Sequence, residues 1–203
     1  LVGGARMRLW LLDILACPAD GCKYYPLKLS IFEWERDDEK RISSVAKGYV
    51  SGDVKAIKKE LKDNVKIDEE KGVIEDELVR KPLDVKKYVD AFKEKIESIF
   101  KHITDLTGAS SELITDIVNF RAPAKLDEKL ENMVYLANWL AFKVNVKSGV
   151  LICEKCGRWY PIIETIPHML PDDLRNKKED KEFLMEWKDK LPERILKSEG
   201  ITT

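Results

Sequence analysis

The four cysteines are the residues whose type and spacing point most clearly to a chemistry. They form two close pairs, Cys17 with Cys22 and Cys153 with Cys156, near opposite ends of a chain of 203 residues. Two thiolates separated by two residues can hold one Zn²⁺ from a tight turn, and Gly157 allows the positive φ that turns backbone amides towards the sulfurs. Four thiolates fill a tetrahedral site and leave no position for water or substrate. We therefore expect one structural Zn²⁺ bound by all four cysteines.

Two other uses of these cysteines stay open on the sequence alone. Disulfide bonds are the first, because paired cysteines in small secreted proteins usually form bridges and some hyperthermophile cytosolic proteins contain them. Thiol redox chemistry at Cys153 and Cys156 is the second, but such a motif is expected at a strand–helix junction, and strand-like segments flank this pair on both sides. The paired spacing in a highly charged chain favours the metal.

The elements that must position the cysteines are short strands at the two ends of the chain. Alternating apolar residues predict a strand over residues 27–34, and three more strands are expected over 150–152, 158–163 and 165–170. A metal that joins both ends closes a very long loop, which is tolerable because the entropy of closure grows only logarithmically with loop length. We expect the two ends to form one zinc-ribbon-like β domain.

Between these ends the apolar residues follow a helical period. Their spacing predicts long helices over residues 85–103 and 126–140, and shorter helices over 53–62 and 112–120, the last one capped by Ser110 or Ser111. The fold class is therefore α+β, with an inserted α-helical domain and a helical C-terminal tail broken near Pro192. The predicted domains are residues 7–40 with 143–175 for zinc, 41–142 for the insertion and 176–203 for the tail.

The composition excludes several classes of protein. Lys and Arg number 36 against 37 Asp and Glu, so the net charge of −1 argues against a nucleic-acid or anionic-membrane binder. The sequence contains no run of 18 apolar residues, the length needed to span a bilayer. Asp13 interrupts the short apolar stretch that otherwise resembles a lipoprotein signal. We expect a soluble, cytoplasmic protein that binds no membrane. Residues 1–6 precede Met7 and are left out of the fold prediction.

The usual signatures of an enzyme are absent from the sequence. None of the ten glycines forms Gly-x-Gly, so there is no Rossmann loop for a nucleotide or S-adenosylmethionine, and there is no Walker motif. The two histidines, His102 and His168, stand near no nucleophile at a readable spacing. We expect no catalytic residue, no organic cofactor and no enzyme activity.

Two blocks of sequence resemble a known family. Residues 7–18 with Pro26 and Leu27, and residues 149–162 with 166–171, are similar to the two ends of the methyltransferase-activator zinc subunit family, the Trm-one-twelve family. A helical insertion between such ends occurs in its longer archaeal and eukaryotic members. The family often has glycine before the Ile-Pro pair, where this chain has Thr165. Because a β-branched residue disfavours φ > 0, we expect a different turn there.

The resemblance implies a non-catalytic subunit that forms a heterodimer with S-adenosylmethionine-dependent methyltransferases and stabilises and activates them. Their substrates are tRNA, rRNA or a translation release factor, so RNA would be met only through the complex. Family members dock by adding a strand to the edge of the methyltransferase sheet, and an exposed strand here offers the means. The expected partner-binding residues are Ile163, Thr165, Ile166, Pro167, His168, Met169 and Leu170.

Two alternatives to this docking surface remain. The same residues could pack on the insertion or the tail within the chain. A zinc ribbon could also bind RNA directly without a methyltransferase, with Arg158, Trp159 and Tyr160 stacking on and pairing with a nucleotide. Further towards the N-terminus, we expect Leu9, Leu12 and Ile14 in the core.

Overall fold

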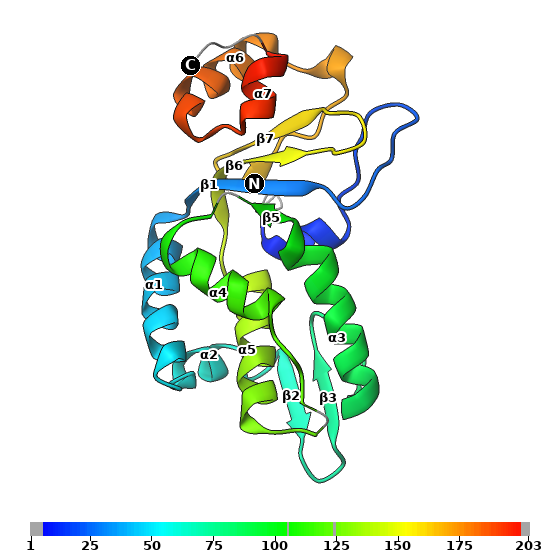
Figure 1. The fold of residues 1–203 in the computed structure, drawn as a ribbon, viewed down its shortest axis with the longest axis vertical. Coiled ribbons are helices and arrows are strands. Elements are labelled where there is room, and N and C mark those ends of the chain that lie inside the picture. The colour runs from blue at the N-terminus through cyan, green and yellow to red at the C-terminus, as the bar shows by residue number, and fades with distance from the viewer. Residues whose placement is uncertain (1–5, 105, 124, 200–203) are drawn as a thin grey trace.

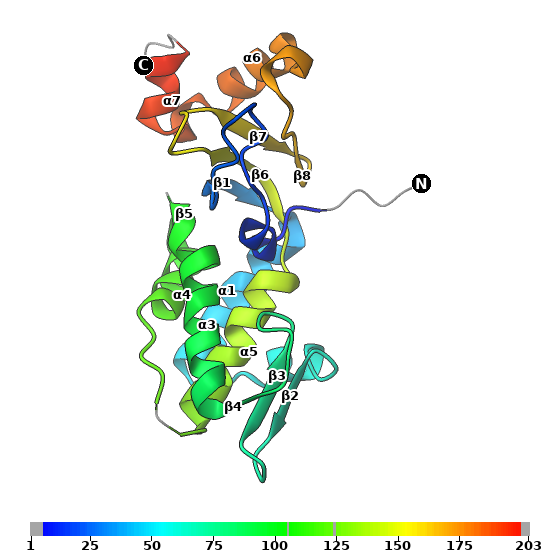
Figure 2. The same cartoon turned by 90° about the vertical axis from the view of Figure 1, so that its right-hand side faces the viewer.

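The structure is a computed structural model that describes residues 6–104, 106–123 and 125–199. Residues 1–5 and the last four residues of the predicted tail lie outside this part of the chain. A β-sheet lies between two helical layers, with the insertion on one face and the C-terminal helices on the other (Figures 1 and 2). This arrangement has the predicted α+β class.

The central sheet has five strands in the order β5-β1-β6-β7-β8. The strands are β1 (Lys28–Trp34), β5 (Ile103–Thr104), β6 (Val146–Ile152), β7 (Trp159–Ile163) and β8 (Ile166–Pro167). Strand β1 pairs antiparallel with β6, with Leu29 opposite Leu151. The two ends of the chain therefore form one sheet, as the paired cysteines predict.

The insertion joins β1 to β6 and is built mainly from five helices. They are α1 (Arg36–Val50), α2 (Lys55–Glu60), α3 (Val85–Ile99), α4 (Gly108–Val118) and α5 (Glu128–Phe142). The long helices α3 and α5 were predicted, and each begins at an aspartate whose side chain accepts a backbone hydrogen bond: Asp84 from Lys87 and Asp127 from Leu130. These two caps fix where the helices begin.

Three details of the insertion differ from the prediction. A three-stranded sheet, β2 (Val65–Asp68), β3 (Val73–Asp76) and β4 (Leu83–Asp84), lies within it. The apolar period continues to Ile103, but helix α3 ends at Ile99, and Ile103 pairs with Leu29 of β1 after the 3₁₀ turn η2 (Phe100–His102). Helix α4 begins at Gly108, so the predicted cap at Ser110 or Ser111 is wrong; Ser110 instead bonds the carbonyl of Thr107.

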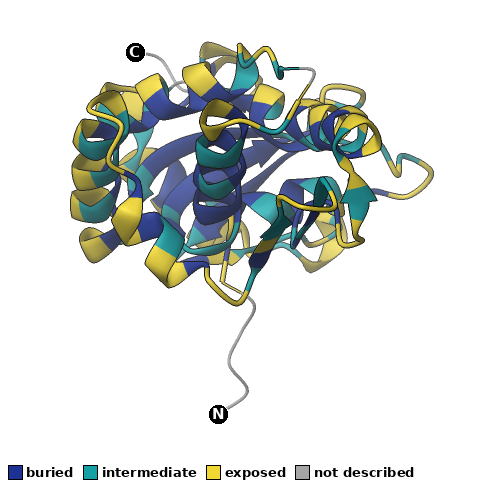
Figure 3. Cartoon of the chain, turned by 90° about the horizontal axis from the view of Figure 1, so that it is seen from below, coloured by how far each residue is buried: buried dark blue, intermediate teal, exposed yellow. Residues whose placement is uncertain are grey.

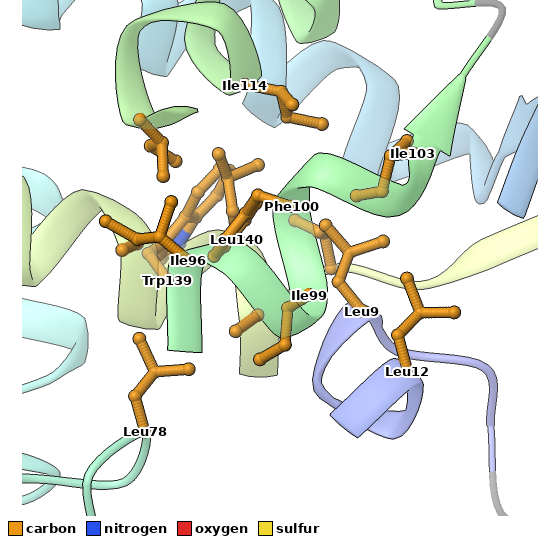
Figure 4. Packing of buried hydrophobic residues seen from close by; sticks show 14 of the residues in the cluster. Leu9, Leu12, Leu78, Ile96, Ile99, Phe100, Ile103, Ile114, Trp139 and Leu140 are labelled. Carbon is orange, nitrogen blue, oxygen red and sulfur yellow. The ribbon is translucent and has the colours of Figure 1, made fainter. Parts of the chain in front are cut away.

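The main apolar core runs without a break from the sheet into the insertion. Figure 3 shows the buried residues gathered along the inside of the molecule. Figure 4 shows Ile96 of α3 and Phe100 of η2 close to Leu140 of α5, with Leu9 beside them. Leu9 and Leu12 lie in the 3₁₀ turn η1 (Leu9–Asp13) and are buried as predicted.

The prediction for Ile14 was wrong, since 54% of its surface is exposed. The turn η1 ends at Asp13, and Ile14 is the first residue after it, whereas Leu15 and Cys17 return to the core.

The C-terminal segment, residues 171–199, covers the other face of the sheet. It contains the short turns η3 (Asp172–Leu174) and η4 (Lys188–Lys190) and the helices α6 (Lys177–Glu186) and α7 (Glu193–Ser198). Pro192 immediately precedes α7, which confirms the predicted break. A second apolar cluster joins this segment to the sheet and consists of Phe32, Val150, Ile152, Trp159, Phe183, Leu184, Leu191, Ile195 and Leu196.

Candidate metal centre and partner-binding edge

The four cysteines come from two loops at the same end of the sheet. Cys17 and Cys22 lie in the loop between η1 and β1, whereas Cys153 follows β6 directly and Cys156 lies in the turn before β7. The Sγ atoms of Cys17 and Cys156 are 3.6 Å apart, and those of Cys22 and Cys153 are 3.7 Å apart. All four sulfurs lie within 4.8 Å of one another.

This donor set fits one tetrahedral zinc ion. A Zn–S bond of about 2.3 Å places tetrahedral sulfurs about 3.8 Å apart, close to the two distances found here. A disulfide needs an S–S separation of about 2.05 Å, and all four thiols are free. The disulfide alternative is therefore wrong in this structure, and the four cysteines can hold a single ion between the two ends of the chain.

The second cysteine loop, residues 153–157, has the backbone expected of a metal-binding turn. The amide of Cys153 donates to the carbonyl of Arg158, and the amide of Gly157 donates to the carbonyl of Cys153, both at 2.9 Å. Gly157 has φ +79°, which is the positive φ predicted from the presence of a glycine at this position. In the first cysteine loop, residues 17–22, the amide of Cys17 donates to the carbonyl of Tyr24 at 2.9 Å.

The surroundings of the sulfurs give the metal-free thiols different pKa values. Burial raises the pKa of Cys153 to about 12. Burial also opposes ionisation of Cys156, but the backbone amide and guanidinium of Arg158 outweigh it and lower the pKa to about 6. The hydroxyl of Tyr160 lies 3.1 Å from Sγ of Cys17, and burial raises the pKa of Tyr160. Tyr160 therefore keeps its proton and can donate it in a hydrogen bond to the Cys17 thiolate.

Both the fold and the sulfur cluster define the class of protein. Two cysteine loops that meet at the end of the antiparallel strands β1, β6 and β7, with four thiolates and no open position, form a zinc-ribbon-like domain. A family model described as Trm112p-like protein matches residues 8–164, so the chain belongs to the Trm112p-like family of methyltransferase activators. No curated protein and no solved structure matches the chain.

The matched residues include all four cysteines and end at Glu164. The edge strand β8 and the C-terminal segment follow the match.

Among the described helices, not one combines the length and the apolar character that a membrane span requires.

The expected partner-binding residues lie at the free end of the sheet, where β8 is the last strand. Ile166 and Leu170 are 47% and 42% exposed, so the C-terminal segment leaves them accessible. Pro167 and His168 are partly exposed, whereas Ile163 packs partly against the second apolar cluster and Met169 against the main core. Thr165 is buried.

The strand at this edge is shorter than predicted. It contains only Ile166 and Pro167, and after it the amide of His168 donates to the carbonyl of Pro161 at 2.8 Å. Further along the chain, Leu174 in the turn η3 is 64% exposed and was not among the predicted residues. No periodicity in the sequence marks it, because this segment has neither a regular helix nor a long strand.

The expected conformation of Thr165 was wrong. Its φ is +68°, and Glu164 before it has φ +46°, so these two residues form the turn between Ile163 and Ile166. Two backbone hydrogen bonds hold Thr165 in place: its amide donates to Lys147 at 2.9 Å, and its carbonyl accepts from Met7 at 2.6 Å. These tertiary contacts offset the strain of a β-branched residue in the left-handed region.

The two aromatic residues of the direct RNA-binding alternative are not available for stacking. Trp159 and Tyr160 are 4% and 0% exposed, and Arg158 forms an ion pair with Asp172 at 2.7 Å. Among the histidines, His102 is partly buried, and this burial lowers its pKa. His102 lies in the turn η2 of the insertion, and His168 follows β8 in the central sheet.

Proposed function

We propose that this chain is the non-catalytic activating and stabilising subunit of S-adenosylmethionine-dependent methyltransferases that modify tRNA, rRNA or a translation release factor. The match of residues 8–164 to the Trm112p-like family carries the proposal. The subunit would act in the cytoplasm as one half of a heterodimer. It would contact RNA only through that complex, because the near-zero net charge of −1 provides little long-range attraction for a polyanion.

The zinc ion has a structural role in this proposal. A bound Zn²⁺ would crosslink Cys17 and Cys22 to Cys153 and Cys156, and thereby hold the two ends of the chain together. The hydroxyl of Tyr160 would orient the sulfur of Cys17, and the backbone amides of residues 155, 156 and 158 would orient those of Cys153 and Cys156. We also propose the organisation 7–40 with 143–175 for the zinc domain, 41–142 for the insertion and 176–203 for the tail.

The partner is proposed to bind at the β8 edge. The backbone of Ile166 is already paired with Ile163, and Pro167 has no N–H, so β8 itself offers few free hydrogen-bonding groups. The exposed side chains of Ile166 and Leu170 provide the apolar surface for a partner to cover. This supports a docking mode that combines limited strand pairing with burial of apolar side chains.

The test compares two charged substitutions of exposed apolar residues. Ile166→Asp places a charge in the proposed interface. The control, Val50→Asp, places a charge at the C-terminal end of α1, where Val50 is 82% exposed. Each variant is tagged, co-expressed with a candidate methyltransferase from the same genome and purified, and its zinc content is measured. We expect Ile166→Asp to lose the methyltransferase and keep one equivalent of zinc, while Val50→Asp keeps both.

A second substitution at the β8 edge tests the same interface independently. Leu170→Asp should also abolish the complex. If both edge variants bind the enzyme as wild type does, the β8 edge is not the interface, although the activating role could still hold. If the chain transfers a methyl group to RNA without a partner, the non-catalytic role is wrong.

A further inference from the structure

The C-terminal segment contacts the second cysteine loop and its flanking residues directly. Side-chain hydrogen bonds make this connection, among them Arg194 Nη2 to the carbonyl of Cys153 at 3.0 Å, Arg158 Nε to Asp172 Oδ2 at 2.7 Å, and Trp159 Nε1 to Glu199 Oε1 at 2.7 Å. In each pair one residue lies within the family match over 8–164 and the other lies outside it. The contacts therefore join the second cysteine loop, which the family model covers, to the C-terminal segment, which lies outside the family match.

Apolar packing supports the same connection. Ile152 immediately precedes the second cysteine loop and Trp159 follows it, and both belong to the cluster that contains Ile195 and Leu196 of α7. Trp159 stacks on Phe183 of α6, with 6.2 Å between the ring centroids. The strands on both sides of the loop are thus fixed against the C-terminal helices.

Arg175 adds a further contact with Trp159. Its guanidinium lies 4.3 Å from the centroid of the indole ring, and Nη1 donates to the carbonyl of Trp159 at 2.8 Å. Asp180 of α6 in turn accepts from Arg175 Nε at 2.9 Å. Trp159, the first residue of β7, is therefore held through its side chain and its backbone together.

The backbone turn that presents a metal ligand orients its sulfur. A turn held by hydrogen bonds keeps the thiolate directed at the ion, and loss of such supporting contacts weakens metal binding. In the second cysteine loop that turn is closed by the hydrogen bond from Gly157 to the carbonyl of Cys153, and Arg194 donates to the same oxygen. A charged donor strengthens the contact, so the turn cannot open freely while α7 stays docked.

We propose that the C-terminal segment locks the second cysteine loop and thereby slows the loss of zinc. Arg194 is the positioning residue, because it connects α7 to the backbone of a metal ligand. The cluster around Trp159 keeps α7 in place for this contact. The lock concerns metal retention by the chain itself, so it stands or falls independently of any methyltransferase.

The test measures how fast zinc leaves the full-length protein. Zinc-loaded wild type, Arg194→Gln and Lys197→Gln are mixed under reducing conditions with excess 4-(2-pyridylazo)resorcinol, and the coloured zinc complex is followed with time. Lys197 is the matched control on the same helix, because its described ion pair is an exposed one with Glu193. We expect Arg194→Gln to release zinc about five times faster than wild type and Lys197→Gln to release it at the wild-type rate.

Two further measurements separate the lock from a general loss of stability. Hydrogen exchange at the Gly157 amide should speed up in Arg194→Gln, while the melting temperatures of both variants stay within a few degrees of wild type. Arg194→Lys, which keeps a cationic donor, should restore part of the retention. The proposal is overturned if Arg194→Gln releases zinc at the wild-type rate, or if Lys197→Gln accelerates release equally.

Discussion

The two faces of the central sheet are covered in different ways, and strand β6 shows the difference between adjacent residues. Leu151 points into the large core that the sheet shares with the insertion, whereas Val150 and Ile152 belong to the smaller cluster under α6 and α7. The C-terminal segment also depends on side-chain hydrogen bonds to backbone carbonyls, from Lys190 to Phe32 at 2.7 Å and from Arg194 to Cys153 at 3.0 Å. The insertion is therefore part of the core of the sheet, and the C-terminal segment is a separately attached layer.

Metal removal should have the largest effect, because it acts on both faces at once. Zinc binding to four cysteines contributes on the order of 10 kcal/mol to folding, and here a bound ion would join the strands that both helical layers cover. We expect the chelated, reduced protein to lose the cooperative unfolding transition of its sheet. Circular dichroism melts with and without chelator measure this, and identical melts would show that the cysteines are not a structural zinc site.

Truncation of neighbouring residues on β6 tests the comparison of the two faces. Leu151→Ala should lower the free energy of unfolding of the whole protein by about 3 kcal/mol, because it leaves a cavity in the shared core. Ile152→Ala should cost less, about 2 kcal/mol at the lower end of the same range, and act mainly on the C-terminal layer.

Urea unfolding combined with hydrogen exchange separates these two effects. Ile152→Ala should increase exchange in α6 and α7 while the helices of the insertion stay protected. Equal increases of exchange in both layers would contradict the distinction between a shared core and an attached layer.

The smallest expected effect concerns an ion pair on the insertion side. Asp13 in η1 accepts from Lys95 of α3 at 2.6 Å and from Ser98 at 2.8 Å. Burial alone would raise the pKa of Asp13, but these two hydrogen bonds and the charge of Lys95 lower it below its usual 3.8. The folded state therefore binds this proton less readily than the unfolded state. The carboxylate stabilises the fold above about pH 4, and the contribution is lost as the pH falls through the folded-state pKa.

Asp13→Asn should therefore be slightly less stable than wild type at neutral pH, and its stability should decline less steeply below about pH 4. Urea unfolding at a series of pH values measures both. Parallel acid limbs for wild type and Asp13→Asn would show that this ion pair adds nothing to the attachment of the insertion.

The sequence alone predicted the features that depend on paired cysteines or on a regular spacing of apolar residues. The spacing of the cysteines predicted that both ends of the chain meet, and the apolar faces of α3 and α5 marked two helices of the insertion. It was insufficient where tertiary contacts decide. The strands β2, β3 and β4 have only two to four residues, too few for a clear alternation. Nothing local could show that Met7 and Lys147 hold Thr165 at φ +68°.

The surface that receives the C-terminal helices was also not predictable. The apolar residues of α6 and α7 show that these helices must pack somewhere, but the receiving residues come from β1 at one end of the chain and from β6 and β7 at the other. Ile14 illustrates the same limit, because its apolar neighbours are buried while it lies beyond the end of η1.

The central claim, that this chain is a subunit of methyltransferases, is tested most directly by what binds it in its own cells. The tagged, zinc-loaded chain is purified from native lysate beside Ile166→Asp, and the co-purifying proteins are identified by mass spectrometry and quantified. Our account predicts one or more S-adenosylmethionine-dependent methyltransferases in near-stoichiometric amounts with wild type and a strong loss with Ile166→Asp. Recovery of zinc-loaded wild-type protein without any methyltransferase would contradict the account.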